Sequence, residues 1–315
     1  MSRSTPSAAS RPRLLPVTLL VLCAVSYGGT FSLNRIAADA GLSPIAYAFW
    51  QSATPAAVLW VVSWLTGAPP GWRAVDCVAY MLIGGGGIGI PTTLLTYVAP
   101  HLPVGLVTVV LALSPPLTYL FGLLVRLERF HWLSVVGIVC GFSGVLLIAA
   151  PTAALPSPGM AAWFLLSLVA PLLFASANII AAVMLPKQSN SFGMAAGILL
   201  GSALVLALVM AFSGQSFDFP PLLSAGALAI LGSAVINGSF IVMFLEIIRI
   251  AGPVFFSQFN YLAVAAGIGW GYALFGERLG IYIWMALTLM LVGVLLVTAR
   301  EPILRLLAGV RRTST

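Results

Sequence analysis

Residues able to perform acid–base, nucleophilic or metal chemistry are few and scattered in this sequence. Its 315 residues include only 7 Asp and Glu, 2 His and 3 Cys. His101 and His131 fall in predicted loops on opposite sides, and no serine has a plausible histidine and carboxylate partner. Because catalysis needs a clustered acid, base or nucleophile, the sequence predicts no catalytic residue, no metal site and no cofactor.

Uncharged polar and aromatic residues inside long apolar segments are more informative. An amide that lacks a partner in hydrocarbon is costly, so these side chains should point inward, where some bind substrate and others only bridge helices. The predicted substrate-binding residues are Tyr27, Asn34, Trp50, Gln51, Tyr97, Asn178, Asn237, Gln258, Asn260 and Tyr261. Gln258 and Tyr261 are spaced to share one helix face. The aromatic members are suited to stacking on a ring or an aliphatic side chain.

Every acidic residue lies near the end of an apolar segment or in a loop. Proton-driven pumps usually place a carboxylate within the membrane, so this pattern argues against proton coupling without excluding it. Glu246 is the deepest candidate for coupling. Arg249 lies one helical turn away, and an interfacial pair at a helix end is the simpler interpretation. For Glu128 and Glu277 we expect structural roles, pairing with basic neighbours or fixing loop turns.

A glycine run, Gly84 to Gly89 with only Ile88 between, resembles a phosphate-binding loop but lacks the Lys-Ser/Thr that would follow one. In an apolar helix, small residues let backbones approach closely, so we interpret the run as a packing surface. Pro91 should end or kink this helix. Glycine and proline weaken the backbone hydrogen bonds of this helix. Such backbone is tolerated within a membrane where it lines a cavity, so this helix is a candidate cavity wall.

The composition places the whole chain in a membrane. Hydrophobic residues make up 61% of it and charged residues 7%, against about 25% charged in soluble proteins. Uninterrupted apolar segments predict helices, because barrel strands would alternate. The ten predicted spans are 14–36, 44–66, 76–98, 103–125, 131–150, 160–184, 193–213, 222–245, 252–275 and 280–298. The expected fold is therefore an all-α integral membrane protein with ten transmembrane helices. Cys23, Cys77 and Cys140 lie in or beside these segments without paired spacing, and we expect them to be core residues.

Basic residues predict the orientation. With the N-terminus inside, all of the 14 Lys and Arg residues except Arg35 and Arg278 fall on the inner side, as the positive-inside rule requires. We expect a bacterial inner-membrane protein with both termini cytoplasmic. The predicted divisions are a disordered tail (1–13), a first five-helix unit (14–150), a linker (151–159), a second five-helix unit (160–299) and a basic tail (300–315).

The two units resemble each other. Glu128-Arg129 closes the predicted fourth helix and Glu277-Arg278 the ninth, an offset of 149 residues. Gly144 and Gly293 follow these glutamates at the same distance and open similar apolar runs. Because five helices is an odd number, a second copy would enter the bilayer from the opposite side. Inverted repeats of this kind are typical of secondary transporters, whose substrate site lies between the halves. Chance similarity between helices rich in Gly, Leu and Val is the alternative.

At these positions the chain resembles the drug/metabolite transporter superfamily, specifically its ten-helix EamA-type members, over about residues 14–299. The similar patterns are Tyr27-Gly28-Gly29-Thr30-Phe31 in the first helix, Ser43-Pro44 opening the second, and Pro115, Glu128 and Arg129 along and after the fourth. Gln51 stands where the family often has an arginine, and Val264 is the second-half counterpart of Pro115. The resemblance implies transport of small metabolites such as amino acids, sugars, nucleotide-sugars or drugs.

Together these observations predict a secondary transporter that exports a small metabolite, such as an amino acid, by alternating access between two inverted repeats. The scarcity of buried charge favours a neutral or zwitterionic substrate. Uptake or exchange by the same fold and, less favoured, a non-transporting membrane scaffold are the alternatives. The expected partners are the substrate and the lipid bilayer, with no nucleic acid, and the protein is expected to be a monomer or homodimer.

Overall fold

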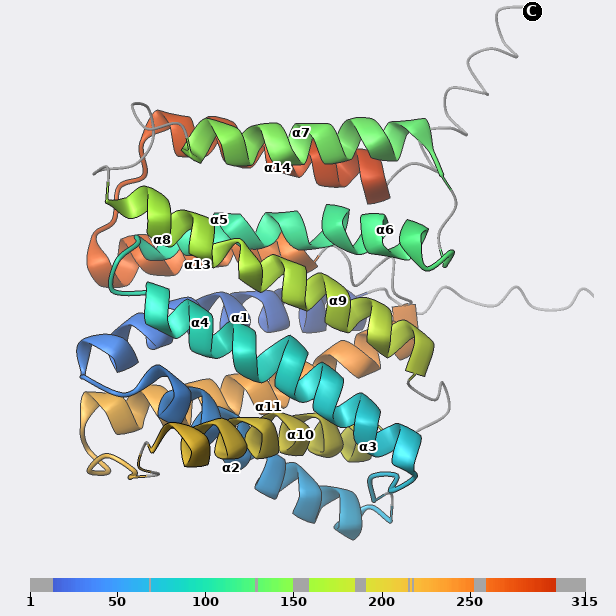
Figure 1. The fold of residues 1–315 in the computed structure, drawn as a ribbon, viewed down its shortest axis with the longest axis vertical. Coiled ribbons are helices and arrows are strands. Elements are labelled where there is room, and N and C mark those ends of the chain that lie inside the picture. Colours follow the sequence, from blue (N-terminus) through green and yellow to red (C-terminus); the bar gives the residue numbers. More distant parts are fainter. Residues whose placement is uncertain are drawn as a thin grey trace, which may run out of the picture.

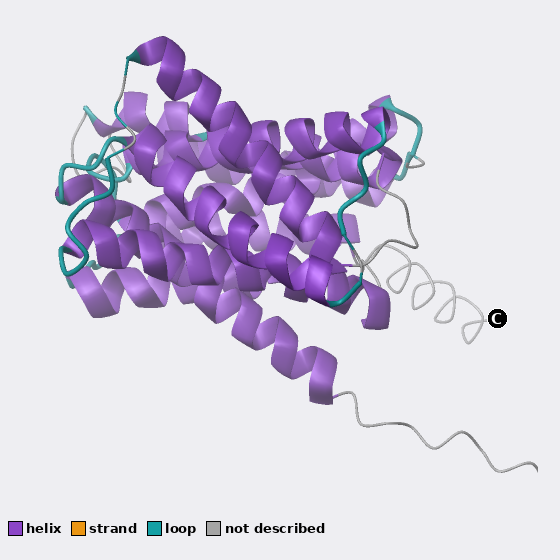
Figure 2. Ribbon diagram, turned by 90° about the horizontal axis from the view of Figure 1, so that it is seen from below, coloured by secondary structure: helices purple, strands orange, loops and turns teal. Residues whose placement is uncertain are grey.

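The computed structural model describes residues 14–67, 69–127, 130–149, 159–184, 191–214, 216, 218–251 and 259–298. Within these ranges the chain consists of helices and connecting loops, with no strand (Figure 2). The helices of the first part are α1 (Leu14–Asp39), α2 (Pro44–Leu65), α3 (Ala74–Tyr80), the π-helix η1 (Met81–Gly89), α4 (Ile90–Val98), α5 (Val104–Val110), the 3₁₀-helix η2 (Leu111–Leu113), α6 (Ser114–Leu124) and α7 (Trp132–Ala149). Those of the second part are α8 (Met160–Ser167), α9 (Val169–Met184), α10 (Ser191–Ser213), α11 (Ala225–Ala251), α13 (Phe259–Phe275) and α14 (Ile281–Thr298).

Seven helices are long and apolar enough to cross a membrane. They are Pro16–Asp39, Pro44–Leu65, Ala74–Val98, Val104–Leu124, Met160–Met184, Ser191–Ser213 and Ala225–Phe244. Three shorter apolar helices, Trp132–Gly144, Leu262–Phe275 and Ile281–Gly293, fall within the remaining predicted spans. The all-helical, membrane-type architecture predicted from the composition is confirmed for the part of the chain that the structure describes.

The helices lie side by side along one direction of the bundle (Figure 1). α7 packs along α14 at one edge, and α2 packs along α10 near the other. Between these edges α1 contacts both α11 and α13, and α9 contacts both η1 and α6. Helices from the two halves of the sequence therefore interleave throughout the bundle.

The glycine run on η1 is a packing surface, as predicted. A Cβ atom on Gly84 would collide with the Ile198 carbonyl oxygen of α10, and one on Gly201 of α10 would collide with the Tyr80 carbonyl oxygen. The two backbones are therefore in direct contact, which only glycine permits. Pro91 is the second residue of α4, which follows the π-helix directly, so the change in helical register falls beside a residue that lacks a backbone N–H.

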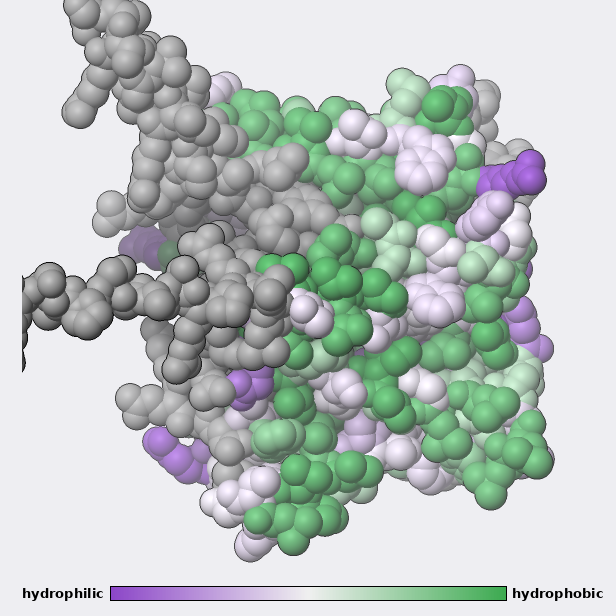
Figure 3. Space-filling view, turned by 180° about the vertical axis from the view of Figure 1, so that it is seen from behind, coloured by the Kyte–Doolittle hydropathy of each residue, from purple (hydrophilic) through white to green (hydrophobic). Residues whose placement is uncertain are grey.

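Large apolar side chains cover the outside of the bundle. Val58, Leu208 and Val235, each within a helix, are 58%, 55% and 69% exposed. Figure 3 shows hydrophobic residues across one face of the molecule, with the most hydrophilic residues near its left and right edges, where the helices end. A soluble monomer rarely exposes such continuous apolar surface, whereas a bilayer would cover it.

Candidate functional site

Two buried amides face each other across α2 and α11. Asn237 Nδ2 donates a hydrogen bond of 2.6 Å to Gln51 Oε1, and the two residues are only 7% and 1% exposed. Gly238 allows this close approach, because a Cβ atom there would lie 2.9 Å from the Pro55 Cβ of α2. Both amides were predicted from the sequence to point inward, and the structure brings them together.

Further buried polar atoms on α1 and α2, which pack against the helices of this pair, have no hydrogen-bond partner among the described residues. Gln51 Nε2, Asn34 Oδ1 and Thr30 Oγ1 are buried without a hydrogen bond, and the Tyr47 side chain is fully buried beside Ser233 of α11. These residues lie on α1, α2 and α11, which pack against one another. We call Thr30, Asn34, Tyr47, Gln51 and Asn237 the polar set. A buried polar group without a partner costs free energy, so the polar set is suited to hold water or a ligand.

The polar set lies within the apolar thickness of the bundle rather than at its surface. Gln51 is seven residues into α2 and Asn237 twelve residues into α11, which corresponds to depths of roughly 10 and 18 Å at the rise of an α-helix. Neither residue carries a formal charge. The arrangement can therefore donate and accept hydrogen bonds within the membrane, but it cannot neutralise an ion.

Aromatic rings flank the polar set. Tyr27 shares a face of α1 with Asn34, and its ring centroid lies 4.4 Å from that of Phe240 and 5.5 Å from that of Phe259. Trp50, next to Gln51, packs edge-on against Phe219 with 5.3 Å between centroids. These rings are suited to make apolar contacts with a bound molecule.

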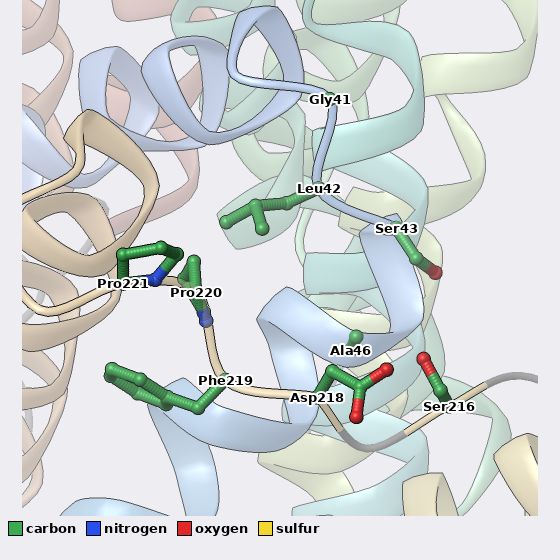
Figure 4. A pocket seen from close by; sticks show the side chains of 9 residues that line it. All are labelled: Gly41, Leu42, Ser43, Ala46, Ser216, Asp218, Phe219, Pro220 and Pro221. Atoms are coloured by element: carbon green, nitrogen blue, oxygen red, sulfur yellow. The ribbon is translucent and has the colours of Figure 1, made fainter.

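An open pocket lies at the end of the bundle where α2 and α11 begin. Its volume is about 510 Å³, and it is lined by Gly41, Leu42, Ser43, Ala46, Ser216, Asp218, Phe219, Pro220 and Pro221. In Figure 4 the Asp218 carboxylate points from the α10–α11 loop toward Ala46 of α2. Since Ala46 directly precedes Tyr47, the pocket lies at the same end of the bundle as the polar set.

The other predicted site residues lie elsewhere or outside the description. Tyr97 is 52% exposed, and its ring lies 5.5 Å from that of Trp163 on α8. Asn178 is exposed and donates a hydrogen bond of 3.2 Å to Thr118 Oγ1. Gln258 lies outside the described residues. Asn260 and Tyr261 lie on α13, but their side chains are outside the description.

Two carboxylates that the sequence analysis identified accept hydrogen bonds in the structure. Glu246 on α11 accepts a hydrogen bond of 3.1 Å from Ser191 Oγ at the start of α10. Glu277, predicted to be structural, accepts hydrogen bonds from the backbone N–H groups of Val104 and Gly105 and from Arg35. Glu128 lies outside the described residues. Groups of three or more His, Cys, Asp or Glu that could hold a metal ion are absent from the described residues, and Cys23, Cys77 and Cys140 are free thiols.

Two members of the polar set were missed by sequence reasoning. Thr30 was quoted only as part of a pattern in the first helix, and Tyr47 was not singled out. A signal was available for Tyr47, because it lies four residues before Gln51 and therefore on the same face of α2. For Thr30 the sequence carries no comparable signal, since threonine is readily accommodated in apolar helices by bonding to its own backbone.

Comparisons with known proteins agree with this architecture. Residues 14–150, which contain α1 to α7, match the model of the EamA-like transporter family. No curated protein matches the sequence. Among solved structures, 23 chains match, and one crystal structure of a protein with 16% sequence identity covers 91% of this chain and 98% of its own, with a TM-score of 0.60. At that identity the likeness concerns the fold alone.

Proposed function

Because residues 14–150 of this chain match the EamA-like transporter family, we propose that the protein is a secondary transporter that exports a small neutral or zwitterionic metabolite, such as an amino acid. In this proposal ten helices form two inverted five-helix repeats in the bacterial inner membrane, with both termini cytoplasmic. The substrate crosses by alternating access, as the two halves move about a site between them.

The helix contacts support an inverted repeat. If the second repeat begins at α8, then α2 corresponds to α10, α7 to α14, and α5 with α6 to α13. Exchanging the two repeats then turns each major contact into another contact that is present. The α1–α11 contact becomes α9–η1, α1–α13 becomes α9–α6, and η1–α10 becomes α11–α2. The remaining large contacts, α2–α10, α7–α14 and α5–α13, join equivalent helices. Two unrelated halves would not be expected to pair so consistently.

The polar set is the proposed substrate site, and the observation that carries the proposal is the buried Gln51–Asn237 pair with its neighbouring unpartnered atoms. Gln51 Nε2 is a free donor and Asn34 Oδ1 a free acceptor. A ligand with both an acceptor and a donor, such as an amide, a polyol or a zwitterionic amino acid, would satisfy both atoms. A strongly charged substrate would find no counter-ion among these residues.

Uptake or exchange is the second candidate function, since the same site can serve either direction and the driving gradient decides the outcome. A membrane scaffold is the alternative of a different class. It has no need for an unsatisfied polar site within the membrane, so it should tolerate apolar replacement of Gln51 and Asn237.

A growth-protection screen tests the proposal. A sensitive bacterial host expressing the protein is challenged with amino acids, their toxic analogues and drugs, and we expect protection against at least one compound. Gln51→Leu, checked for equal abundance in the membrane, should remove the protection. Thr288→Val serves as the control, because Thr288 lies on α14, outside both the polar set and the predicted substrate-binding residues, and its hydroxyl donates to the Trp284 carbonyl of its own helix. Protection that is unaffected by Gln51→Leu would refute the assigned site.

A further inference from the structure

Glu277 joins three separate parts of the chain at one end of the bundle. Its Oε1 accepts hydrogen bonds from the Val104 N–H (2.8 Å) and from Arg35 Nη1 (3.2 Å), and its Oε2 accepts one from the Gly105 N–H (3.1 Å). Arg35 lies on α1, Val104 and Gly105 begin α5, and Glu277 follows α13. The carboxylate therefore connects the ends of α1, α5 and α13.

Several neighbouring residues hold the Glu277 side chain in this position. The Glu277 side chain is only 11% exposed, unlike a typical surface ion pair. Gly271 leaves room for it, since a Cβ atom there would lie 2.7 Å from Glu277 Oε2. Gly276, with a φ of +65°, supplies the left-handed turn that directs Glu277 back over α5. The Arg35 guanidinium is also placed by the Phe275 ring, 4.9 Å from its centroid, and by Asp39, 3.6 Å from Nε.

Along the span formed by α8 and α9, packing becomes looser toward the end opposite Glu277. Along one face of α9, Pro171 is buried, whereas Asn178 and Ala182, nearer the other end, are exposed. A different stripe of this span carries the exposed apolar residues Leu165, Val169, Leu172 and Val183, which are suited to face lipid. Asn178 donates its hydrogen bond to Thr118 Oγ1, so its exposure marks looser packing at this end of the span.

The same difference between ends occurs along the neighbouring span. Every residue of α5, from Val104 to Val110, is buried. Farther along, in α6, Pro115 and Thr118 are partly exposed. Packing is therefore tight where Glu277 lies and looser at the far end of the same helices. In the proposed orientation the tight end is the outer one.

We propose that Glu277, with Arg35 and the Val104 and Gly105 amides, forms a latch that holds the outer ends of α1, α5 and α13 together. The inference rests on the proposed transport function. It identifies the contacts that must break before the outer ends of these helices can separate. Hydrogen bonds to an ionised group are among the stronger ones in proteins. Their loss should therefore shift the population toward an outward-open state.

Cysteine labelling tests the latch without any substrate. Thr108 on α5 is fully buried one turn inside the latch, against Gly267 of α13. In a background with Cys23, Cys77 and Cys140 replaced by alanine, Thr108→Cys is exposed to a membrane-impermeant maleimide added outside intact cells. We expect slow labelling with Glu277 present and labelling about tenfold faster with Glu277→Gln, the scale set by hydrogen bonds to a charged group.

Arg278→Gln is the matched control. Arg278 is the next residue of the same loop and is exposed, so its replacement should leave the labelling rate unchanged. Equal labelling of the Glu277→Gln and parent proteins would overturn the latch. If Glu277→Gln does not reach the membrane, Arg35→Gln decides, because it leaves both amide contacts intact. Faster labelling supports the latch, and unchanged labelling overturns it.

The labelling result is separable from the proposed function. Faster labelling in a protein that transports none of a broad substrate panel would retain the latch and refute transport. Transport with no change in labelling would retain the function and refute the latch.

Discussion

The side-chain amides of Gln51 and Asn237 face each other across α2 and α11, with 2.6 Å between Gln51 Oε1 and Asn237 Nδ2. Each is the other's described side-chain partner, in a bundle that offers few polar alternatives. Gln51 keeps a second, unsatisfied donor in Nε2. The pair therefore has two separable roles, since one bond stabilises the contact between the helices and the remaining donor is available to a ligand.

Replacing one or both amides separates these roles. Asn237→Leu leaves Gln51 buried and unbonded, so we expect it to lower the free energy of unfolding by about 1–3 kcal/mol. The double variant Gln51→Leu, Asn237→Leu removes both polar groups and should recover most of that stability. Transport should be lost in both variants. Thermal unfolding in detergent and substrate efflux from cells are the measurements. A double variant that is stable and still transports would show that the pair is structural.

The glycine run predicts a sharp contrast between neighbouring positions. Gly84→Ala places a methyl group against the Ile198 carbonyl oxygen, whereas nothing lies within 4 Å of a Cβ atom on Gly86. We expect Gly84→Ala to lower the free energy of unfolding by about 1–3 kcal/mol or more, as overpacking does. Gly86→Ala is the control and should change it by less than about 0.5 kcal/mol. Equal unfolding midpoints for the two variants would contradict the close contact between η1 and α10.

The proposed orientation predicts the result of reporter fusions. Alkaline phosphatase requires the oxidising periplasm to form its disulfides. Fused after residue 155, between the two repeats, it should be active, and fused after residue 189 it should be inactive. The reverse pattern would contradict both the orientation and the inversion of the second repeat.

Glu246 is the residue on which proton coupling can be tested. Its carboxylate accepts a hydrogen bond from Ser191 where α10 begins and α11 ends, and a glutamine can accept the same bond. If a proton gradient drives transport through Glu246, then Glu246→Gln should abolish gradient-driven accumulation and spare substrate counterflow. If Glu246 is only structural, both activities should remain within about twofold of the parent, a change of less than 1 kcal/mol. Comparing the two assays in proteoliposomes decides between these roles.

Most of the helical architecture could be predicted from the sequence, because long apolar segments leave the backbone no alternative to helix in lipid. The internal irregularities could not. Nothing in the composition of the span Ala74–Val98 predicts nine residues of π-helix at its centre. In the structure this segment packs directly against α10 at Gly84, a tertiary contact that composition does not encode.

The candidate site was predicted only in part, because the pairing of its side chains also depends on tertiary contacts. Gln51 and Asn237 could be identified as inward-pointing because burial without a partner is costly for any amide. Their pairing depends on how α2 and α11 pack, and sequence spacing does not determine this. Glu277 was expected to pair with a basic residue or fix a loop turn, and the structure shows such a pair. Its partners include Arg35, more than 240 residues away in the sequence. The sequence alone identified Arg35 only as one of two basic residues predicted to lie on the outer side of the membrane.

Counterflow in liposomes tests the central claim most directly. Purified protein is reconstituted into liposomes loaded with amino acids, sugars, nucleosides or cationic drugs, and entry of the same labelled compound is measured. We predict counterflow of at least one neutral or zwitterionic compound by the parent protein and none by Gln51→Leu. If the parent protein neither binds nor moves any compound of the panel, the transporter account is contradicted.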